Sequence, residues 1–145
     1  MIHLILLSIG LLGLQGCVFS DCSLGSPKVV KSVTAGPDLA VDAGMSKCSF
    51  TGYSWTCEAC SPLQVSIGDQ AEVKGKAASQ EWISTDESAV FAASKSLKTT
   101  ATITPGAPPH AGCVDQVVPL ELRVIDGAGV LHSDPLTVTV HCCGN

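Results

Sequence analysis

The stretches Leu120-Glu121-Leu122-Arg123-Val124 and Leu136-Thr137-Val138-Thr139-Val140 decide the fold, because both place an apolar side chain at every second position. Successive side chains of a strand point to opposite faces of a sheet, so this alternation indicates strands with one buried face. Between them, Asp126-Gly127-Ala128-Gly129 supplies residues that tolerate positive φ, as a tight hairpin turn requires. We therefore expect a β-hairpin of residues 117–125 and 136–141.

Shorter segments of the same period precede this hairpin and are separated by turn residues. Outside the N-terminal apolar run no segment has a helical stripe; residues 87–96 come closest but carry no capping signature. Many short strands with frequent turns predict an all-β protein, an Ig-like antiparallel β-sandwich of about seven strands. The expected earlier strands are Val29–Val33, Leu39–Val41, Gln64–Ile67, Gln70–Lys74, Glu81–Ser84 and Thr99–Thr104.

The composition describes one ordered domain and restricts its partners. Of 145 residues, 46% are hydrophobic and only 14% are charged, so a buried core is expected rather than disorder. There are 8 Lys and Arg against 13 Asp and Glu, a formal net charge of −5. Nucleic acids and anionic membrane surfaces bind proteins through an excess of Lys and Arg, so this balance argues against both as partners.

The N-terminal segment has the features of an export signal. Residues 2–14 are apolar apart from His3 and Ser8, and the run is shorter than the roughly 20 residues of a bilayer span. The following Leu14-Gln15-Gly16-Cys17 resembles the lipobox of bacterial lipoproteins. That resemblance implies that residues 1–16 are a lipoprotein signal peptide and that Cys17 becomes a lipidated N-terminus, which anchors the protein in a membrane.

On this interpretation residues 17–28 are the lipidated cysteine and a flexible tether, whose last eleven residues span about 18 Å as a coil. The protein would then be lipid-anchored in the cell envelope, at the outer membrane or the cell surface. Ordinary cleavage after Ser20 would instead give a secreted protein, and an uncleaved anchor is the third alternative. All three place the domain outside the cytoplasm.

Several motifs follow one another in the order that a known extracellular family shows. The first motif is Ala35-Gly36-Pro37-Asp38, and the second runs from Val65-Ser66-Ile67-Gly68-Asp69 to Ser79. Trp82 is the third, and residues 124–129 followed by 133–140 are the fourth. In this order they resemble PKD-type (polycystic-kidney-disease) Ig-like domains. The resemblance implies a non-catalytic extracellular module that serves in adhesion, ligand binding or spacing, and it implies a core position for Trp82.

The resemblance covers residues 28–141, so we expect one PKD-like β-sandwich at residues 29–145. Residues 42–63 stand out from the pattern as a cysteine-rich insertion. The resemblance carries over no catalytic residue, cofactor or metal site.

Cysteine spacing predicts a disulfide-stapled domain, because eight cysteines outside the cytoplasm indicate a disulfide framework. Cys113 precedes the predicted hairpin and Cys142-Cys143 follow it, so Cys113 should bond one of the two. In the insertion we expect one internal pair and one bond to the remaining C-terminal cysteine. Cys22 is then the candidate for the odd thiol. The disulfide candidates are Cys48, Cys57, Cys60, Cys113, Cys142 and Cys143.

Two chemical alternatives use the same cysteines. The stretch Trp55-Thr56-Cys57-Glu58-Ala59-Cys60 is similar to a thioredoxin redox motif, which would make the protein an envelope thiol–disulfide oxidoreductase. A low-pKa thiol needs a helix N-terminus, however, and Pro62 works against a helix here. A zinc site is the other alternative, with ligands from Cys57, Cys60, Cys142, Cys143, His110 and His141. The oxidising compartment argues against zinc.

Other polar residues fit structural roles better than chemical ones. His110, His132 and His141 have no recognisable nucleophile nearby in the sequence, so no hydrolytic site is expected. Asp126 and Asp134 flank the hairpin and could hold calcium, but a turn role for Asp126 and a capping role for Asp134 are favoured.

Phe50, Tyr53 and Trp55 are the best functional lead, since they form half of the six aromatic residues of the chain. Strand alternation would place Tyr53 and Trp55 on one face. If exposed, that face would stack on sugars or dock a protein, and the chain would be a secreted carbohydrate-binding module or an adhesion module. We favour the alternative that the three rings fold over the sandwich as a small satellite core.

Overall fold

The computed structural model describes residues 28–145, all of them in strands, turns and loops. The signal peptide, Cys17, Cys22 and most of the tether lie outside these residues. Within the described part of the chain no helix is long and apolar enough to cross a membrane. The strands are β1 (Val30–Thr34), β2 (Leu39–Ser46), β3 (Cys48–Phe50), β4 (Trp55–Cys57), β5 (Leu63–Ile67), β6 (Glu72–Gly75), β7 (Ala77–Ser84), β8 (Ala89–Phe91), β9 (Thr99–Ile103), β10 (Gly112–Asp126) and β11 (Leu131–Gly144).

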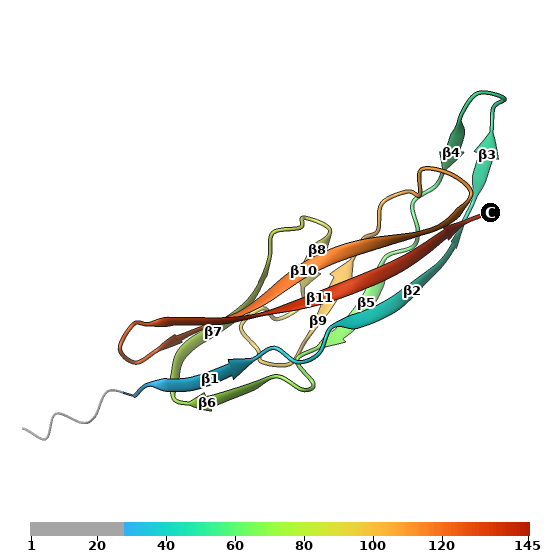
Figure 1. Ribbon diagram of the computed structural model, residues 1–145. Coiled ribbons are helices and arrows are strands. Elements are labelled where there is room, and N and C mark those ends of the chain that lie inside the picture. The colour runs from blue at the N-terminus through green and yellow to red at the C-terminus, as the bar shows by residue number, and fades with distance from the viewer. Residues whose placement is uncertain (1–27) are drawn as a thin grey trace, which may run out of the picture.

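Two sheets form the sandwich that the alternation predicts. One has the strand order β2-β11-β10-β7 and the other β5-β9-β8 (Figure 1). Their apolar faces share one core, to which the first sheet contributes Val118, Leu122 and Val138 and the second Ile67 and Ile103. Two further ribbons, β1-β6 and β3-β4, lie outside these sheets.

The predicted C-terminal hairpin is confirmed and is longer than expected. β10 and β11 pair continuously from Ile125 opposite Leu131 to Gly112 opposite Gly144. Leu120 faces Leu136 and both are buried, whereas the polar residues between the buried positions are more exposed, as period-two alternation requires. The 15 residues of β10 give the domain a long axis of about 50 Å.

Trp82 occupies the core position that the family resemblance implies. It lies in β7 with 1% of its surface exposed, and its indole Nε1 donates a hydrogen bond to the Leu97 carbonyl oxygen at 3.0 Å. Burial of an indole ring is favourable only when its N–H finds an acceptor, and the loop before β9 supplies it. This loop is therefore fixed to the core.

The sandwich departs from the expectation in three ways. β2 pairs with β11 in the parallel direction, so the sandwich is not entirely antiparallel. Residues 42–46 continue β2 beyond its expected end at Val41. The two sheets together hold seven strands, as expected, and the four strands of the β1-β6 and β3-β4 ribbons come in addition. The short β3, β4 and β8 have three residues each, too few for period-two alternation to identify them as strands in the sequence.

The two ends of the long hairpin define two poles. At the N-terminal pole the chain enters the domain beside the β10-β11 turn, where the Gly127 amide donates a hydrogen bond to the Lys28 carbonyl oxygen at 2.8 Å. At the other end, which we call the disulfide pole, the β3-β4 hairpin projects beyond the sandwich (Figure 1). The two poles therefore present different residues on opposite sides of the molecule.

Candidate functional site

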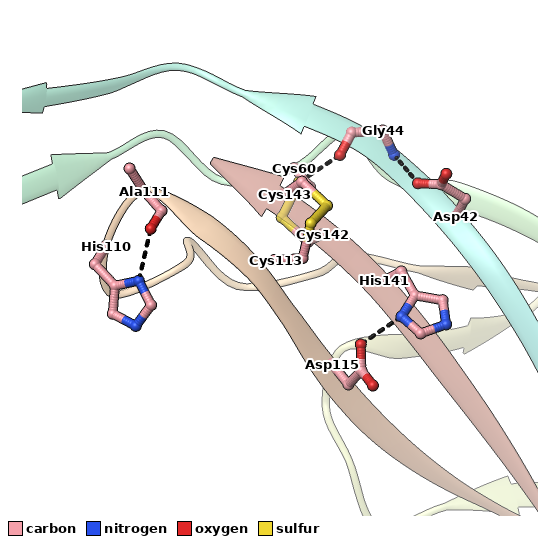
Figure 2. Close-up of a disulfide and its surroundings, with 10 residues drawn as sticks. All are labelled: Asp42, Gly44, Cys60, His110, Ala111, Cys113, Asp115, His141, Cys142 and Cys143. Atoms are coloured by element: carbon pink, nitrogen blue, oxygen red, sulfur yellow. Dashed lines mark hydrogen bonds and ion pairs between the residues drawn. A yellow bond between two sulfur atoms is a disulfide. The ribbon is translucent and has the colours of Figure 1, made fainter. Parts of the chain in front are cut away.

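Three disulfides hold the disulfide pole together, and their pairing agrees with the expectation from topology. Cys113 bonds Cys143, its direct partner across β10 and β11, and Cys60 bonds Cys142 (Figure 2). Because Cys142 and Cys143 are consecutive in a strand, they point to opposite faces of the sheet. Cys142 and Cys60 are buried, while Cys113 is exposed and Cys143 partly so.

The third disulfide, Cys48–Cys57, closes the β3-β4 hairpin. The two cysteines are register partners, and below them the Glu58 amide donates to the Lys47 carbonyl oxygen at 2.9 Å. At the tip, the Thr51 amide donates to the Ser54 carbonyl oxygen at 3.0 Å. The hairpin is thus closed covalently at its base and by backbone hydrogen bonding at its turn.

The three aromatic side chains of this hairpin are exposed, so the expected satellite core is wrong. Phe50, Tyr53 and Trp55 expose 57%, 99% and 43% of their surfaces. Phe50 and Trp55 face each other across the strands with ring centroids 5.1 Å apart and planes inclined at 44°. Tyr53 lies in the turn and not on a strand face with Trp55. The hairpin extends past the sandwich, and no other described element covers these rings.

The surroundings of the aromatic hairpin are polar and acidic. Thr51 and Ser54 bring hydroxyl groups to the turn, where their oxygens lie 3.4 Å apart. Glu58 and Lys47 lie at the base of the hairpin, and Asp42 lies farther along β2, opposite His141. Exposed Met45 lies in β2 opposite Cys143, and the sequence analysis missed it because β2 was expected to end at Val41.

The oxidoreductase interpretation is wrong because its two cysteines are not bonded to each other. Cys57 is bonded to Cys48, and Cys60 is bonded to Cys142. Cys57 also ends a strand, where no helix dipole could lower the pKa of a thiol.

The zinc interpretation fails for a related reason. Its four cysteines are all oxidised, and a disulfide sulfur does not bind zinc as a thiolate does. Of its two histidines, His110 places Nδ1 2.9 Å from the Ala111 carbonyl oxygen, and His141 pairs with Asp115 (Figure 2). Residues 28–145 contain no group of three or more side chains arranged to hold a metal ion.

Asp126 forms the hairpin turn, as the sequence analysis favoured. Its Oδ1 accepts hydrogen bonds from the Ala128 and Val130 amides, both at 2.9 Å, and its Oδ2 lies 3.2 Å from His132 Nε2. The hydrogen bond from the Val130 amide is the main reason that the pKa of Asp126 lies below its usual value. Both oxygens of the Asp126 carboxylate therefore have structural partners in or beside the turn.

A capping role was expected for Asp134 before Pro135, but its side chain makes a different contact. Its Oδ2 accepts a hydrogen bond from the Ala35 amide at 2.8 Å and so joins β11 to the segment that follows β1. Asp38 does the same for the Thr137 amide at 2.7 Å. Two carboxylates of the recognised motifs thus hold the N-terminal strands against the hairpin.

Fold and site together define a class, the disulfide-stapled Ig-like β-sandwich with an exposed aromatic hairpin. No family model matches the chain, and no curated protein matches it. Among solved structures, it is similar to the solution structure of the PKD domain from KIAA 1837 protein. The TM-score is 0.47 at 16% sequence identity, and the match covers 81% of this chain and 93% of that chain.

Proposed function

We propose that the protein is a non-catalytic lipoprotein of the cell envelope that binds a ligand through its aromatic hairpin. The observation that carries this proposal is the exposure of Phe50, Tyr53 and Trp55 at the pole opposite to the point where the chain enters the domain. Aromatic rings on a well-folded surface mark contact sites, because they bury a large area at little cost in side-chain entropy.

The covalent closure of the hairpin supports a binding role over a purely spacing one. A binding surface that becomes ordered only on binding loses affinity, because its conformational entropy is lost at that step. Here the Cys48–Cys57 bond and the turn hydrogen bonds order the hairpin before a ligand binds. A spacer domain would need neither the projecting hairpin nor its three aromatic residues.

Location in the envelope is supported by the disulfides and by the N-terminal sequence. Three disulfides in one small domain are typical of proteins outside the cytoplasm. The lipobox-like Leu14-Gln15-Gly16-Cys17 supports lipidation of Cys17, and residues 17–28 would then tether the domain at its N-terminal pole. The aromatic hairpin would face away from the membrane.

A secreted carbohydrate-binding module is the second candidate. The observation that favours it is the combination of the almost fully exposed Tyr53 ring with the neighbouring Thr51 and Ser54 hydroxyls. Sugars are bound through aromatic faces that contact their C–H groups and through polar groups that contact their hydroxyls. Ordinary cleavage before Asp21 would release such a module from the cell.

The mass of the mature N-terminal peptide, isolated from membranes and medium of the native host, separates the two. Acylated Cys17 is expected for the lipoprotein, and an unmodified N-terminus at Asp21 would contradict lipid anchoring.

Retention on immobilised envelope polysaccharides and envelope proteins tests the hairpin itself. The Tyr53→Ala and Trp55→Ala variants should each lose retention by tenfold or more if these rings are at the centre of the contact, since such rings contribute about 1.4 kcal/mol or more. The control is Val90→Ala, at an exposed position of β8 outside the hairpin. Equal retention of all variants would rule out the hairpin as the binding site.

A further inference from the structure

The N-terminal pole carries a group of cations that the net charge of the chain conceals. Lys28, Lys76 and Lys95 are placed there by backbone contacts: the Lys28 carbonyl accepts from Gly127, the Lys76 amide donates to Val29, and the Lys95 carbonyl accepts from Gln80. Within residues 28–145 none of these three lysines forms an ion pair. Lys31, exposed in β1, adds a fourth such cation.

Most carboxylates of the same pole are paired or buried. Glu72 pairs with Lys74 at 3.4 Å, and Glu121 pairs with Arg123 at 3.0 Å. Asp126 is buried in the hairpin turn, so among the exposed carboxylates here Glu81, across from Arg123 in the sheet register, is left without an ion pair within residues 28–145. The four unpaired lysines therefore leave this pole with a positive surface, although the whole chain has a net charge of −5.

Exposed apolar side chains accompany these cations. Ile125 and Leu131 are cross-strand partners, so their side chains lie on the same face, and Val130 is exposed in the turn beside them. Val29, next to Lys28, is also exposed. Ile125 and Leu131 line an open groove of about 390 Å³ together with Lys95 and Arg123. The lining of this groove also includes Glu81, and Lys28, next to Val29, contacts the turn that joins the strands of Ile125 and Leu131, so apolar side chains and cations lie together at this pole.

We propose that this N-terminal pole docks on the surface of an anionic phospholipid bilayer. Valine, leucine and isoleucine would enter the boundary between headgroups and acyl chains, while the lysines contact lipid phosphates. The position of the surface supports this occupant, because the chain enters the domain at Lys28, in contact with the hairpin turn. This orientation argument rests on the proposed lipid anchor at Cys17, from which about 18 Å of tether reaches the pole.

The inference revises the expectation drawn from net charge. An overall balance of −5 argues against an anionic surface only if the charges are evenly spread. Here four exposed lysines without ion pairs lie at one pole beside one such carboxylate, Glu81, whereas toward the other pole Asp42 and Glu58 accompany Lys47. The field at each pole then has its own sign, and an anionic bilayer would also orient the molecule.

Fluorescence quenching of the mature protein by brominated lipids tests the proposal. Variant Leu131→Trp places a reporter on the surface, and Val117→Trp places a matched reporter at an exposed β10 position outside it. The vesicles contain brominated phosphatidylcholine, with or without phosphatidylglycerol. We expect Leu131→Trp to be quenched in vesicles with phosphatidylglycerol at low salt, with quenching relieved at high salt. Val117→Trp should not be quenched.

Charge variants measure the lysine contribution. In the Leu131→Trp background, Lys76→Gln and Lys95→Gln should each lower the ratio of docked to undocked protein about fivefold, since each lysine near such a surface contributes roughly 1 kcal/mol. The matched control is Lys47→Gln at the disulfide pole, which should leave the ratio unchanged.

The outcomes separate this proposal from the proposed function. Absence of quenching for Leu131→Trp, or equal quenching of both reporters, overturns the docking surface whether or not Cys17 is acylated. Quenching with a mature N-terminus at Asp21 would retain the surface and reject the anchor. Lysine variants without effect would reject the anionic contact even if the apolar contact remained.

Discussion

Gly68 occupies the turn between β5 and β6, where no other residue fits. Its φ is +81°, and an added Cβ would lie 1.9 Å from the Leu97 carbonyl oxygen. That oxygen accepts the hydrogen bond of the buried Trp82 indole. A side chain at residue 68 would therefore disturb the core through Leu97 as well as strain its own backbone.

We predict that Gly68→Ala lowers the free energy of unfolding by roughly 2–5 kcal/mol, because left-handed strain and a lost buried hydrogen bond add together. Urea unfolding measures this loss. The control is Gly129→Ala, which has a similar φ of +82° but open space around the added Cβ. It should lose only the roughly 1–2 kcal/mol of backbone strain. Equal losses in the two variants would show that the Leu97 contact is unimportant.

Asp126 gives the hairpin turn a dependence on pH. Because the amide of Val130 and other donors hold the pKa of Asp126 below 3.8, the unfolded state binds more protons at acid pH. The stabilisation is complete above pH 3.8 and is lost as the pH falls through the lower folded pKa.

We therefore predict that Asp126→Asn lowers the thermal midpoint at neutral pH and that this difference shrinks below pH 3.8. Thermal unfolding followed by circular dichroism at several pH values measures it. Asp69→Asn, in the exposed pair with Lys98, serves as control and should have little effect at neutral pH. A difference for Asp126→Asn that persists unchanged in acid would contradict the role of its charge.

Single residues also show where the sequence was informative. Asp126 could be placed because its role depends on a local pattern, a carboxylate in a turn, whereas the position of Trp82 came from the resemblance to PKD-type domains. Phe50 and Trp55 could not, because the same alternation describes a hairpin that folds over a core and one that projects into solvent. Their burial depends on whether another element lies above them, which no local pattern encodes.

The three disulfides act on elements of different size. Cys60–Cys142 closes 82 residues, Cys113–Cys143 closes 30 within the β10-β11 hairpin, and Cys48–Cys57 closes 9 within β3-β4. In the chain-entropy model these bonds stabilise by about 4.5, 3.6 and 2.6 kcal/mol, respectively.

We predict that paired alanine replacements of Cys60/Cys142 and of Cys113/Cys143 follow this order in their loss of unfolding free energy, as measured in guanidinium chloride. The Cys48→Ala/Cys57→Ala variant should differ in kind, since its hairpin lies outside the core: amides of β3 and β4 should exchange faster with little change in the global transition. A large global loss from this pair, or a reversed order of the other two, would contradict the model.

At the level of elements, topology could be predicted where pairing is local. The β10-β11 hairpin and its cysteine partners follow from one turn and one alternating pattern. The parallel pairing of β2 with β11 joins residues about a hundred positions apart, and Gly44 and a shift in register between His141 and Cys143 interrupt the alternation of β2. The extent of β2 and its partner were therefore not visible in the sequence.

The whole molecule has two unlike ends on one long axis. Exposed lysines and aliphatic side chains lie at the N-terminal pole, while the exposed aromatic side chains lie at the disulfide pole. Composition averages over this separation, so the net charge of −5 does not describe the surface of either pole by itself. With the N-terminal pole on a bilayer, the axis of about 50 Å would hold the aromatic hairpin in the aqueous phase.

This arrangement predicts that the two native tryptophans differ in their accessibility to an aqueous quencher and that neither contacts the bilayer. In wild-type protein on vesicles, Trp55 should be quenched by aqueous acrylamide and not by brominated acyl chains, whereas buried Trp82 should resist both. Trp55→Phe is the control, since it should remove the acrylamide-sensitive emission alone. Quenching of Trp55 by brominated lipid would contradict the arrangement, because it would place the aromatic hairpin in the membrane and make the lipid, not an envelope glycan or protein, its ligand.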